Sequence, residues 1–370
     1  MARPARLLDT VHRLRRAVSR RSGPPRGILI VAAGGLGDTV LFSLVAARFA
    51  ALAHAGEPVT VLLRKDGAKT AFCLPSELAV ETVDFGRFDK SAVYRWNVLE
   101  RLYRANFRLV ISTDFLRHPH LDEAMIAATA APETAAMIAR PWPKYESALA
   151  ANQRRFTRLF DSGPARRDKV MRWTDFANWL TGTNLPPPKV RLDITRRTAA
   201  MANTVTQEIV LQPFSAVAAK QPDVGCYLAL ADALPDGMRI RVTGLQSDLD
   251  ANPKFKKLIE KQNVEFDSST FTEICERLLA AKLVVSADTA LMHLAAALGA
   301  PTLCLASAAY VGEIVPYDPS TKPDNVSFLF QEMPCQGCLG VCIHPLKDER
   351  FACVDALTPE RVVAAVLERL

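Results

Sequence analysis

The residues best suited to chemistry in this sequence lie in a short polar turn between two apolar segments. Asp288 and Thr289 follow the apolar run 281–286, and His293 comes five residues after the aspartate. The run predicts a buried parallel strand, and residues 290–298 predict a helix. A helix N-terminus has free N–H groups and the positive end of a dipole, which favour an anion such as phosphate. The turn therefore predicts an anion site at the carboxyl end of a strand.

A second turn of this kind lies near the start of the chain. The apolar segment 27–33 predicts a buried strand, the glycine-rich stretch 34–37 predicts a tight turn, and residues 39–52 predict a helix. Asp38 stands between the turn and the helix. Its carboxylate would suit a general base that takes a proton from a hydroxyl group, and it would equally suit a helix N-cap.

The elements that must position these residues alternate between strand and helix patterns. Further apolar, β-branched runs predict strands at 59–63, 80–85, 109–112, 208–212, 239–243 and 302–306. This alternation predicts an α/β fold with two doubly wound parallel-sheet domains. The proline-rich stretch 183–188 marks the boundary between them. The predicted parts are a basic tail and linker (1–26), an N-terminal domain (27–185), a C-terminal domain (190–357) and a C-terminal helix (358–370).

Other polar residues are expected near Asp38. Asp114 follows the predicted strand 109–112 and is expected to face the same cleft. His118 and His120 are interpreted as polar loop residues, with a contact to an acceptor sugar as the alternative. The basic and aromatic stretch 140–172 is interpreted as a solvated helix face, although such groups also suit phosphorylated sugars.

The segment 286–301 resembles the signature of glycosyltransferase family 9, the ADP-heptose:lipopolysaccharide heptosyltransferases. It reads Ser-Ala-Asp-Thr-Ala-Leu-Met-His-Leu-Ala-Ala-Ala-Leu-Gly-Ala-Pro. The resemblance implies the GT-B fold, with two domains facing a cleft. It also implies an inverting glycosyltransferase that moves a heptose-like sugar from a nucleotide diphosphate donor, ADP-heptose, to a lipopolysaccharide core acceptor.

The same resemblance assigns roles to individual residues. Asp38 matches the family's proposed general base, and Lys220 matches a lysine that would neutralise a donor phosphate. The helix N-terminus and this lysine would stabilise the leaving diphosphate, so no cofactor is required for catalysis. The implied donor-binding residues are Gly37, Lys220, Asp288, Thr289, Ala290 and His293.

The chain also departs from the family pattern. Ala290 stands where the family usually has glycine, Phe214 stands in a turn that usually reads Pro-Gly, and Gly34 replaces a small hydroxyl residue. Two alternatives therefore stay open: a non-catalytic nucleotide-sugar-binding or scaffold relative, and a GT-B phosphorylase or epimerase-like enzyme.

A cluster of cysteines precedes the C-terminal helix. Its members are Cys335, Cys338, Cys342 and Cys353, with His344 among them. Thiolates at this spacing suit a structural Zn or Fe site. The alternative is a packed loop of reduced cysteines.

The net charge of +7 comes entirely from the first 27 residues, which hold eight arginines and one aspartate. The rest of the chain carries no net charge, which argues against a nucleic-acid partner. As a helix, residues 4–20 would carry Leu7, Val11, Leu14 and Val18 on one face and arginines opposite. This pattern predicts an anchor on an anionic membrane surface, with a solvated or disordered tail as the alternative. Without a recognisable signal peptide or membrane span, the expected location is cytoplasmic, peripheral on the inner face of the inner membrane.

Overall fold

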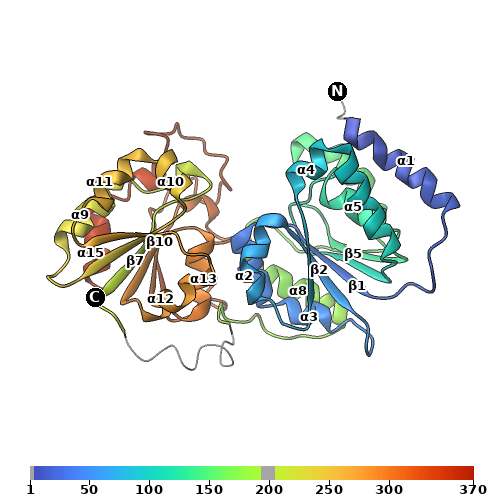
Figure 1. The fold of residues 1–370 in the computed structure, drawn as a ribbon, viewed down its shortest axis with the longest axis horizontal. Coiled ribbons are helices and arrows are strands. Elements are labelled where there is room, and N and C mark those ends of the chain that lie inside the picture. Colours follow the sequence, from blue (N-terminus) through green and yellow to red (C-terminus); the bar gives the residue numbers. More distant parts are fainter. Residues whose placement is uncertain (1–3, 193–204) are drawn as a thin grey trace. The chain divides into compact units, whose positions relative to one another are not determined.

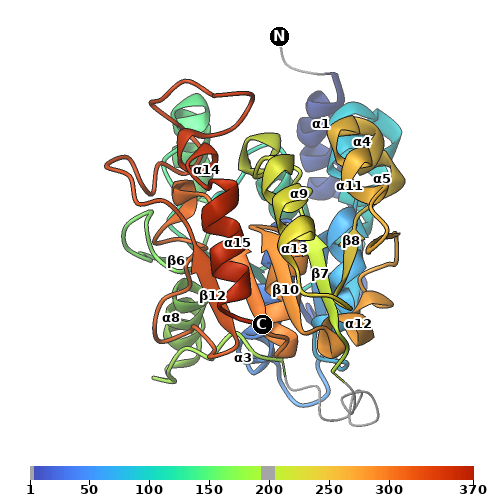
Figure 2. The ribbon, with the colours of Figure 1, turned by 90° about the vertical axis from the view of Figure 1, so that its left-hand side faces the viewer.

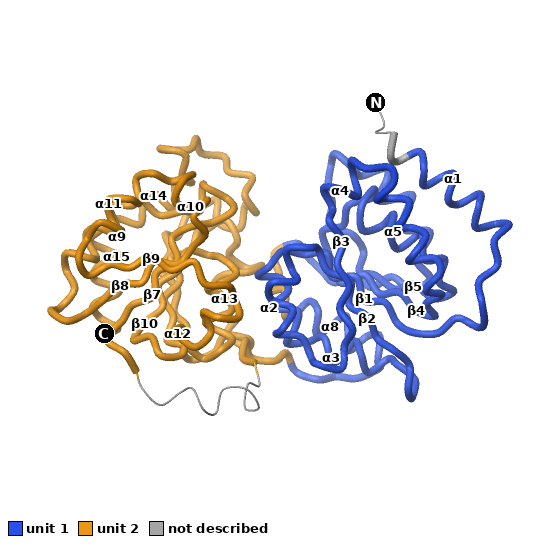
Figure 3. Tube along the Cα trace, in the orientation of Figure 1, with its two compact units in different colours: residues 1–165, 172–186 blue, residues 166–171, 187–370 orange. Residues whose placement is uncertain are grey.

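The computed structural model describes residues 4–192 and 205–370. The chain forms two compact units, Met1–Ala165 with Arg172–Pro186 and Arg166–Met171 with Pro187–Leu370 (Figure 3). Residues 1–3 of the predicted tail, and 193–204 of the predicted C-terminal domain, lie outside the described residues.

Unit 1 is built on a six-stranded parallel sheet. Its strands are β1 (Ile28–Ala32), β2 (Val59–Arg64), β3 (Ala79–Val83), β4 (Leu109–Ser112), β5 (Glu133–Met137) and β6 (Arg158–Phe160). Their order is β3-β2-β1-β4-β5-β6. All pairings are parallel, and in the β1–β4 pair Val31 lies beside Ser112. The central strands are buried on both faces because their residues are apolar without alternation.

Helices cover both faces of this sheet (Figure 1). One face carries α4 (Phe85–Lys90), α5 (Ala92–Arg104) and α6 (Asp122–Thr129), and the other carries α2 (Leu36–Ser43), α3 (Ala46–Ala50) and α8 (Lys169–Thr181). Leu99 and Met125 pack on the first face, while Phe42 meets Trp173 on the second. The N-terminal helix α1 (Pro4–Val18) lies beside α5.

Unit 2 repeats the same plan. Its strands are β7 (Glu208–Gln212), β8 (Arg239–Thr243), β9 (Val264–Asp267), β10 (Leu283–Ala287), β11 (Thr302–Leu305) and β12 (Val326–Leu329). Their order is β12-β11-β10-β7-β8-β9, and all pairings are parallel. The helices α9 (Val224–Ala233), α11 (Lys256–Ile259) and α15 (Pro359–Leu367) lie on one face (Figure 2). On the other lie α12 (Ile274–Ala280) and α13 (Ala290–Leu298).

The remaining elements are short. They are α7 (Glu146–Gln153), α10 (Gln246–Ala251), α14 (Ala352–Asp355) and the 3₁₀ turns η1 (Lys65–Cys73), η2 (Pro143–Tyr145), η3 (Ala218–Lys220), η4 (Pro253–Phe255) and η5 (Ala308–Tyr310). None of the helices within the described ranges has both the length and the apolar character that a membrane crossing requires.

The prediction of two parallel, doubly wound sheets is confirmed. The prediction of one helix over 39–52 is wrong. α2 begins three residues earlier, at Leu36, and ends at Ser43, and a separate helix α3 begins at Ala46. In each sheet the strand order reverses once, between β1 and β4 and between β7 and β10. Ligands of open α/β sheets bind at the carboxyl ends of the strands beside such a switch point.

Candidate functional site

The switch point of unit 2 holds an ion pair. Asp288 follows β10, and Lys220 ends the 3₁₀ turn η3 that follows β7. The lysine Nζ lies 2.5 Å from Oδ2 of the aspartate, and the two side chains are only 11% and 3% exposed. The ammonium also lies over the ring of Tyr310, 4.6 Å from its centroid. The sheet topology thus brings together two predicted site residues that are 68 positions apart in the sequence.

The helix α13 begins directly beside this pair. Thr289 is its N-cap residue, but the threonine hydroxyl makes no capping hydrogen bond and instead lies 3.1 Å from the Ser286 hydroxyl. The first N–H groups of a helix have no partner within the helix. They and the dipole therefore favour a negative group near Ala290, the first residue of α13. The predicted helix over 290–298 is confirmed, and it ends at Gly299 in a left-handed conformation with φ of 91°.

His293 lies on the other side of Asp288. Its Nε2 is 3.9 Å from Oδ1 of the aspartate, and its Nδ1 is 2.6 Å from the Tyr317 hydroxyl. Burial raises the pKa of Tyr317 well above its ordinary value, so the phenol stays neutral. Tyr317 therefore fixes the imidazole against the aspartate. This tyrosine was not predicted, because it lies 24 residues further along the chain in a loop.

The turn after β7 explains one departure from the family pattern. Phe214 is 4% exposed and packs against Phe255, with 5.0 Å between the ring centroids. A Cβ added at Gly244 would lie 2.6 Å from the Phe214 ring. Gly244, directly after β8, thus leaves space for the Phe214 ring, and this ring packs in the hydrophobic core of unit 2.

The switch point of unit 1 holds Asp38. The helix α2 begins at Leu36 with Gly35 as its N-cap, so Asp38 is the third helical residue. Its Oδ2 accepts a hydrogen bond from the Gly35 amide at 2.9 Å. The alternative that Asp38 is the N-cap residue is therefore wrong, because Gly35 occupies that position. The Asp38 carboxylate nevertheless accepts a hydrogen bond from an amide at the helix start. The other predicted residue of this turn, Gly37, precedes it in α2.

The absence of a side chain at Gly34 leaves space for the Asp38 carboxylate. A Cβ added at residue 34 would lie 2.5 Å from Cβ of Asp38 and 2.8 Å from its Oδ2. A Cβ added at Gly35 would come no closer than 3.9 Å. Close approach therefore calls for glycine at 34 but not at 35.

Two more carboxyl groups lie at the same edge of the sheet. Asp114 follows β4, and its Oδ2 accepts a hydrogen bond from the Ala33 amide at 2.6 Å. Asp122, in the first turn of α6, is 2% exposed. Burial and the charge of Asp114 raise the pKa of Asp122 well above its ordinary value. Asp114 was expected here, whereas Asp122 was missed because its burial arises from tertiary packing.

The loops after β4 and β5 bring four rings together. His118 lies 4.6 Å from Tyr145 and 5.7 Å from Trp142 between ring centroids, and His120 lies 6.0 Å from Tyr145. Trp142 and Tyr145 meet edge to face at 4.7 Å. These residues, which we call the ring cluster, are partly exposed. The two histidines are loop residues as expected, but their contact with the aromatic rings was not predicted.

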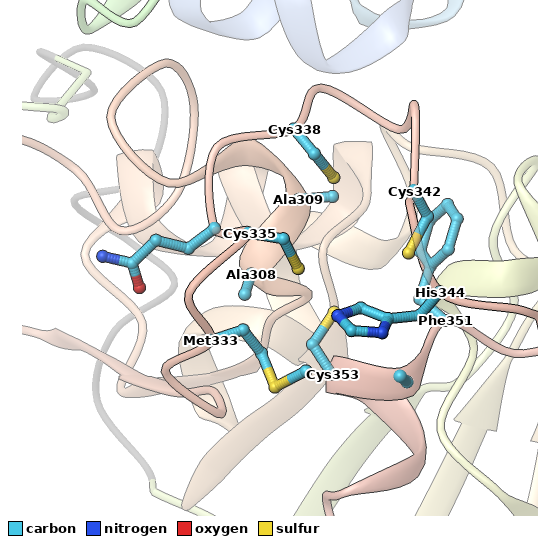
Figure 4. Close-up of a pocket in the computed structure, with 11 residues that line it drawn as sticks. Ala308, Ala309, Met333, Cys335, Cys338, Cys342, His344, Phe351 and Cys353 are labelled. Atoms are coloured by element: carbon cyan, nitrogen blue, oxygen red, sulfur yellow. The ribbon is translucent and has the colours of Figure 1, made fainter.

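The cysteine cluster lines one small pocket in unit 2 (Figure 4). All four cysteines are free thiols, and burial raises the pKa of Cys353. His344 and Met333 line the same pocket. Within the described ranges, no three His, Cys, Asp or Glu side chains are arranged to hold a metal ion as they stand.

Comparisons with known proteins point to one family. The family model "Glycosyltransferase family 9 (heptosyltransferase)" matches residues 134–339. Among solved structures, Escherichia coli heptosyltransferase WaaC with ADP-2-deoxy-2-fluoro heptose is similar at 20% identity and a TM-score of 0.65, over 93% of this chain and 99% of that one. A search of curated protein sequences finds no match.

Two further structures share the fold. A family 9 glycosyltransferase from Veillonella parvula has 15% identity and a TM-score of 0.65, over 94% of this chain and 97% of that one. The iron-containing dodecameric glycosyltransferase TibC from enterotoxigenic E. coli has 15% identity and a TM-score of 0.52, over 95% and 77%. At these identities the likeness concerns the fold, which is GT-B.

Proposed function

Since this chain belongs to glycosyltransferase family 9 and is a glycosyltransferase, we propose that it moves a heptose-like sugar from ADP-heptose to a lipopolysaccharide core acceptor with inversion at the anomeric carbon. The observation that carries this proposal is the Lys220–Asp288 pair at the N-terminus of α13. A cation and a helix N-terminus at a switch point suit a diphosphate leaving group.

The proposed reaction uses both switch points. The acceptor hydroxyl oxygen attacks the anomeric carbon and forms the new glycosidic bond, while the bond from that carbon to the diphosphate oxygen breaks. Asp38 takes the hydroxyl proton. Lys220 and the first N–H groups of α13 stabilise the charge that develops on the departing nucleoside diphosphate. Asp288 holds the lysine in place, and His293 holds Asp288 from its other side.

The ring cluster suits the acceptor. Partly exposed aromatic rings offer flat apolar faces for sugar rings, and the two histidines add hydrogen-bonding groups. The cluster follows β4 and β5, so it lies at the carboxyl edge of the sheet that also carries Asp38. We infer that Trp142 and Tyr145 hold the acceptor saccharide. Trp142→Ala should then raise the acceptor KM at least tenfold and leave the affinity for ADP unchanged.

The location follows from the acceptor. A lipid-borne acceptor is presented at a membrane surface, so the proposed enzyme acts peripherally at the cytoplasmic face of the inner membrane. The four cysteines suit a structural Zn or Fe by their chemistry, and TibC is an iron-containing protein of the same fold. The lining of the cysteine pocket includes neither Lys220 nor Asp288, so this metal is proposed as a structural group with no part in the transfer.

Calorimetry followed by a transfer assay tests the proposed function. ADP should bind more tightly than UDP or GDP. Incubation with ADP-heptose and a heptose-free lipopolysaccharide core should add one heptose, seen by mass spectrometry, with inverted anomeric configuration by NMR. Binding of ADP without any transfer to such acceptors would contradict the proposal.

A further inference from the structure

The N-terminal helix is held to unit 1 by its polar face. Arg95 in α5 is completely buried and donates hydrogen bonds to both carboxylate oxygens of Asp9, at 2.7 and 2.6 Å. His12 is buried, with its Nε2 3.5 Å from Oε2 of Glu100. Arg16 donates to the carbonyl of Ala128, at 2.8 Å, and to the preceding carbonyl of α6. Thus α1 is a docked element of the unit, and the alternative of a disordered tail is wrong for residues 4–18.

This docking turns the apolar stripe of α1 outward. Leu7, Val11, Leu14 and Val18 are 65%, 51%, 68% and 85% exposed. A surface helix ordinarily buries its apolar stripe and exposes its charges. Here the polar face with Asp9, His12 and Arg16 contacts the unit, so the outward apolar stripe is a surface that a lipid phase can cover.

Beneath α1 lies a pocket of about 260 Å³. Three arginines line it, Arg13 and Arg16 from α1 and Arg155 from the segment just after α7. Glu123, an acidic residue in the lining, already accepts hydrogen bonds from Arg117, at 2.8 Å, and from Asn152. The pocket, which we call the arginine pocket, is therefore positively charged.

The negative charges near the arginines of this pocket balance them only in part: Glu123 and Asp9 raise the pKa of Arg155, but burial and Arg13 lower it by more. Nε of Arg16 is buried and has no hydrogen-bond partner among the described residues. Burial and the charge of Arg13 lower the pKa of both Arg16 and Arg155. Buried donors and mutually repelling guanidinium groups favour an anion with several acceptor oxygens, and a phosphate matches them in geometry.

We propose that α1 and the arginine pocket form a docking surface for an anionic phospholipid bilayer, in which the outward stripe enters the interface and the pocket receives a lipid phosphate. In an interfacial helix the apolar face lies at the acyl boundary and the basic flank lies at the headgroups. Arg13 is exposed, lines the arginine pocket and directly precedes Leu14 of the stripe, so it links the two parts of this surface. The proposal rests on the proposed peripheral location, but not on the identity of the sugar or of the base.

Vesicle binding of the full chain tests this surface. Wild-type protein should co-sediment with vesicles of phosphatidylglycerol and phosphatidylcholine, and not with phosphatidylcholine alone. Arg155→Gln and Leu14→Ser should each weaken vesicle affinity about fivefold or more. The matched controls are Arg154→Gln, beside the pocket arginine, and Val93→Ser, which is 72% exposed on α5, and they should bind as wild type.

The outcomes separate a bilayer from a soluble phosphate. Inorganic phosphate at about 50 mM, chosen to saturate a weak anion site, is added as a competitor of the vesicles. If phosphate competes, and Arg155→Gln weakens vesicle binding while Leu14→Ser does not, the pocket is a soluble-anion site and bilayer docking is overturned. Equal binding by all variants also overturns it. Transfer to a soluble acceptor should be unchanged in Arg155→Gln and Leu14→Ser, so failure of the surface and failure of the proposed reaction are distinguishable. Deletion of the tail is a poorer test, because it strips the buried Arg95 of Asp9.

Discussion

Lys220 and Asp288 form a nearly buried ion pair, with 2.5 Å between Nζ and Oδ2, at the switch point between the neighbouring strands β7 and β10. The lysine comes from the turn after one strand and the aspartate from the end of the other. The carboxylate therefore holds the ammonium beside the N-terminus of α13, an arrangement that suits the diphosphate of the proposed donor.

This pair can be tested apart from its structural role. Lys220→Met should destabilise the protein by about 3–5 kcal/mol, because it leaves the charge of Asp288 buried and unpaired. Adding Asp288→Asn removes that charge, so the double variant should regain most of the lost stability in urea unfolding. Its ADP affinity should still be at least tenfold below wild type by calorimetry. Full recovery of ADP affinity in the double variant would make the pair purely structural.

The glycine turn before Asp38 offers a matched pair of substitutions. Gly34→Ala puts a methyl group against the Asp38 side chain, whereas Gly35→Ala meets nothing closer than 3.9 Å. Displacement of a catalytic group by about 1 Å costs about 10²-fold. We expect kcat to fall about 10- to 100-fold in Gly34→Ala and to change little in Gly35→Ala, with donor affinity kept in both. Equal kcat in the two variants would show that Asp38 tolerates the displacement.

The proposed structural metal rests on the thiolate chemistry of the four cysteines and can be tested by composition. Protein purified without chelator should contain about one equivalent of Zn or Fe per chain by elemental analysis, and Cys338→Ser should lose it. Cys73→Ser is the control, because Cys73 does not line this pocket. Metal-free protein of normal stability would leave the cluster as reduced, packed cysteines.

A pair in unit 1 predicts a pH dependence of stability. Hydrogen bonds from Arg108 lower the pKa of Glu57 from 4.5 to about 2. Because the folded-state pKa is depressed, the stabilisation is full above about 4.5 and is lost as the pH falls toward 2. Glu57→Gln should thus lower the free energy of unfolding by about 3 kcal/mol at pH 7, with a difference from wild type that shrinks below pH 4.5.

Glu133 provides the comparison for that pair. It contacts the same Arg108 at 3.5 Å but is 48% exposed. Glu133→Gln should therefore change stability by less than about 1 kcal/mol. An effect as large as that of Glu57→Gln, or one independent of pH, would contradict the assignment.

Much of the fold was predictable because its central strands are apolar and β-branched. The strand β4 and the strand β7 have the predicted limits. The strand β5 (Glu133–Met137) was missed because it is rich in alanine, and β6 because it has only three residues. Such strands form through pairing with neighbours rather than through their own sequence preference.

The candidate site was predictable where it rests on short motifs. Asp38, Lys220 and Asp288 each follow a strand that the sequence marks clearly. Tyr317 and Asp122 act through burial and through partners distant in the chain, which no local pattern encodes. The orientation of α1 was likewise hidden, because a helical pattern shows two faces without showing which one is covered.

Transfer by Asp38→Asn tests the central claim most directly. Asparagine can still accept the Gly35 amide hydrogen bond, so stability should barely change. It cannot take the acceptor proton, so turnover should fall about 10²- to 10⁴-fold while calorimetry shows unchanged ADP affinity. Near-normal turnover, measured where the chemical step limits the rate, would contradict the account and would move the search for the base to Asp114.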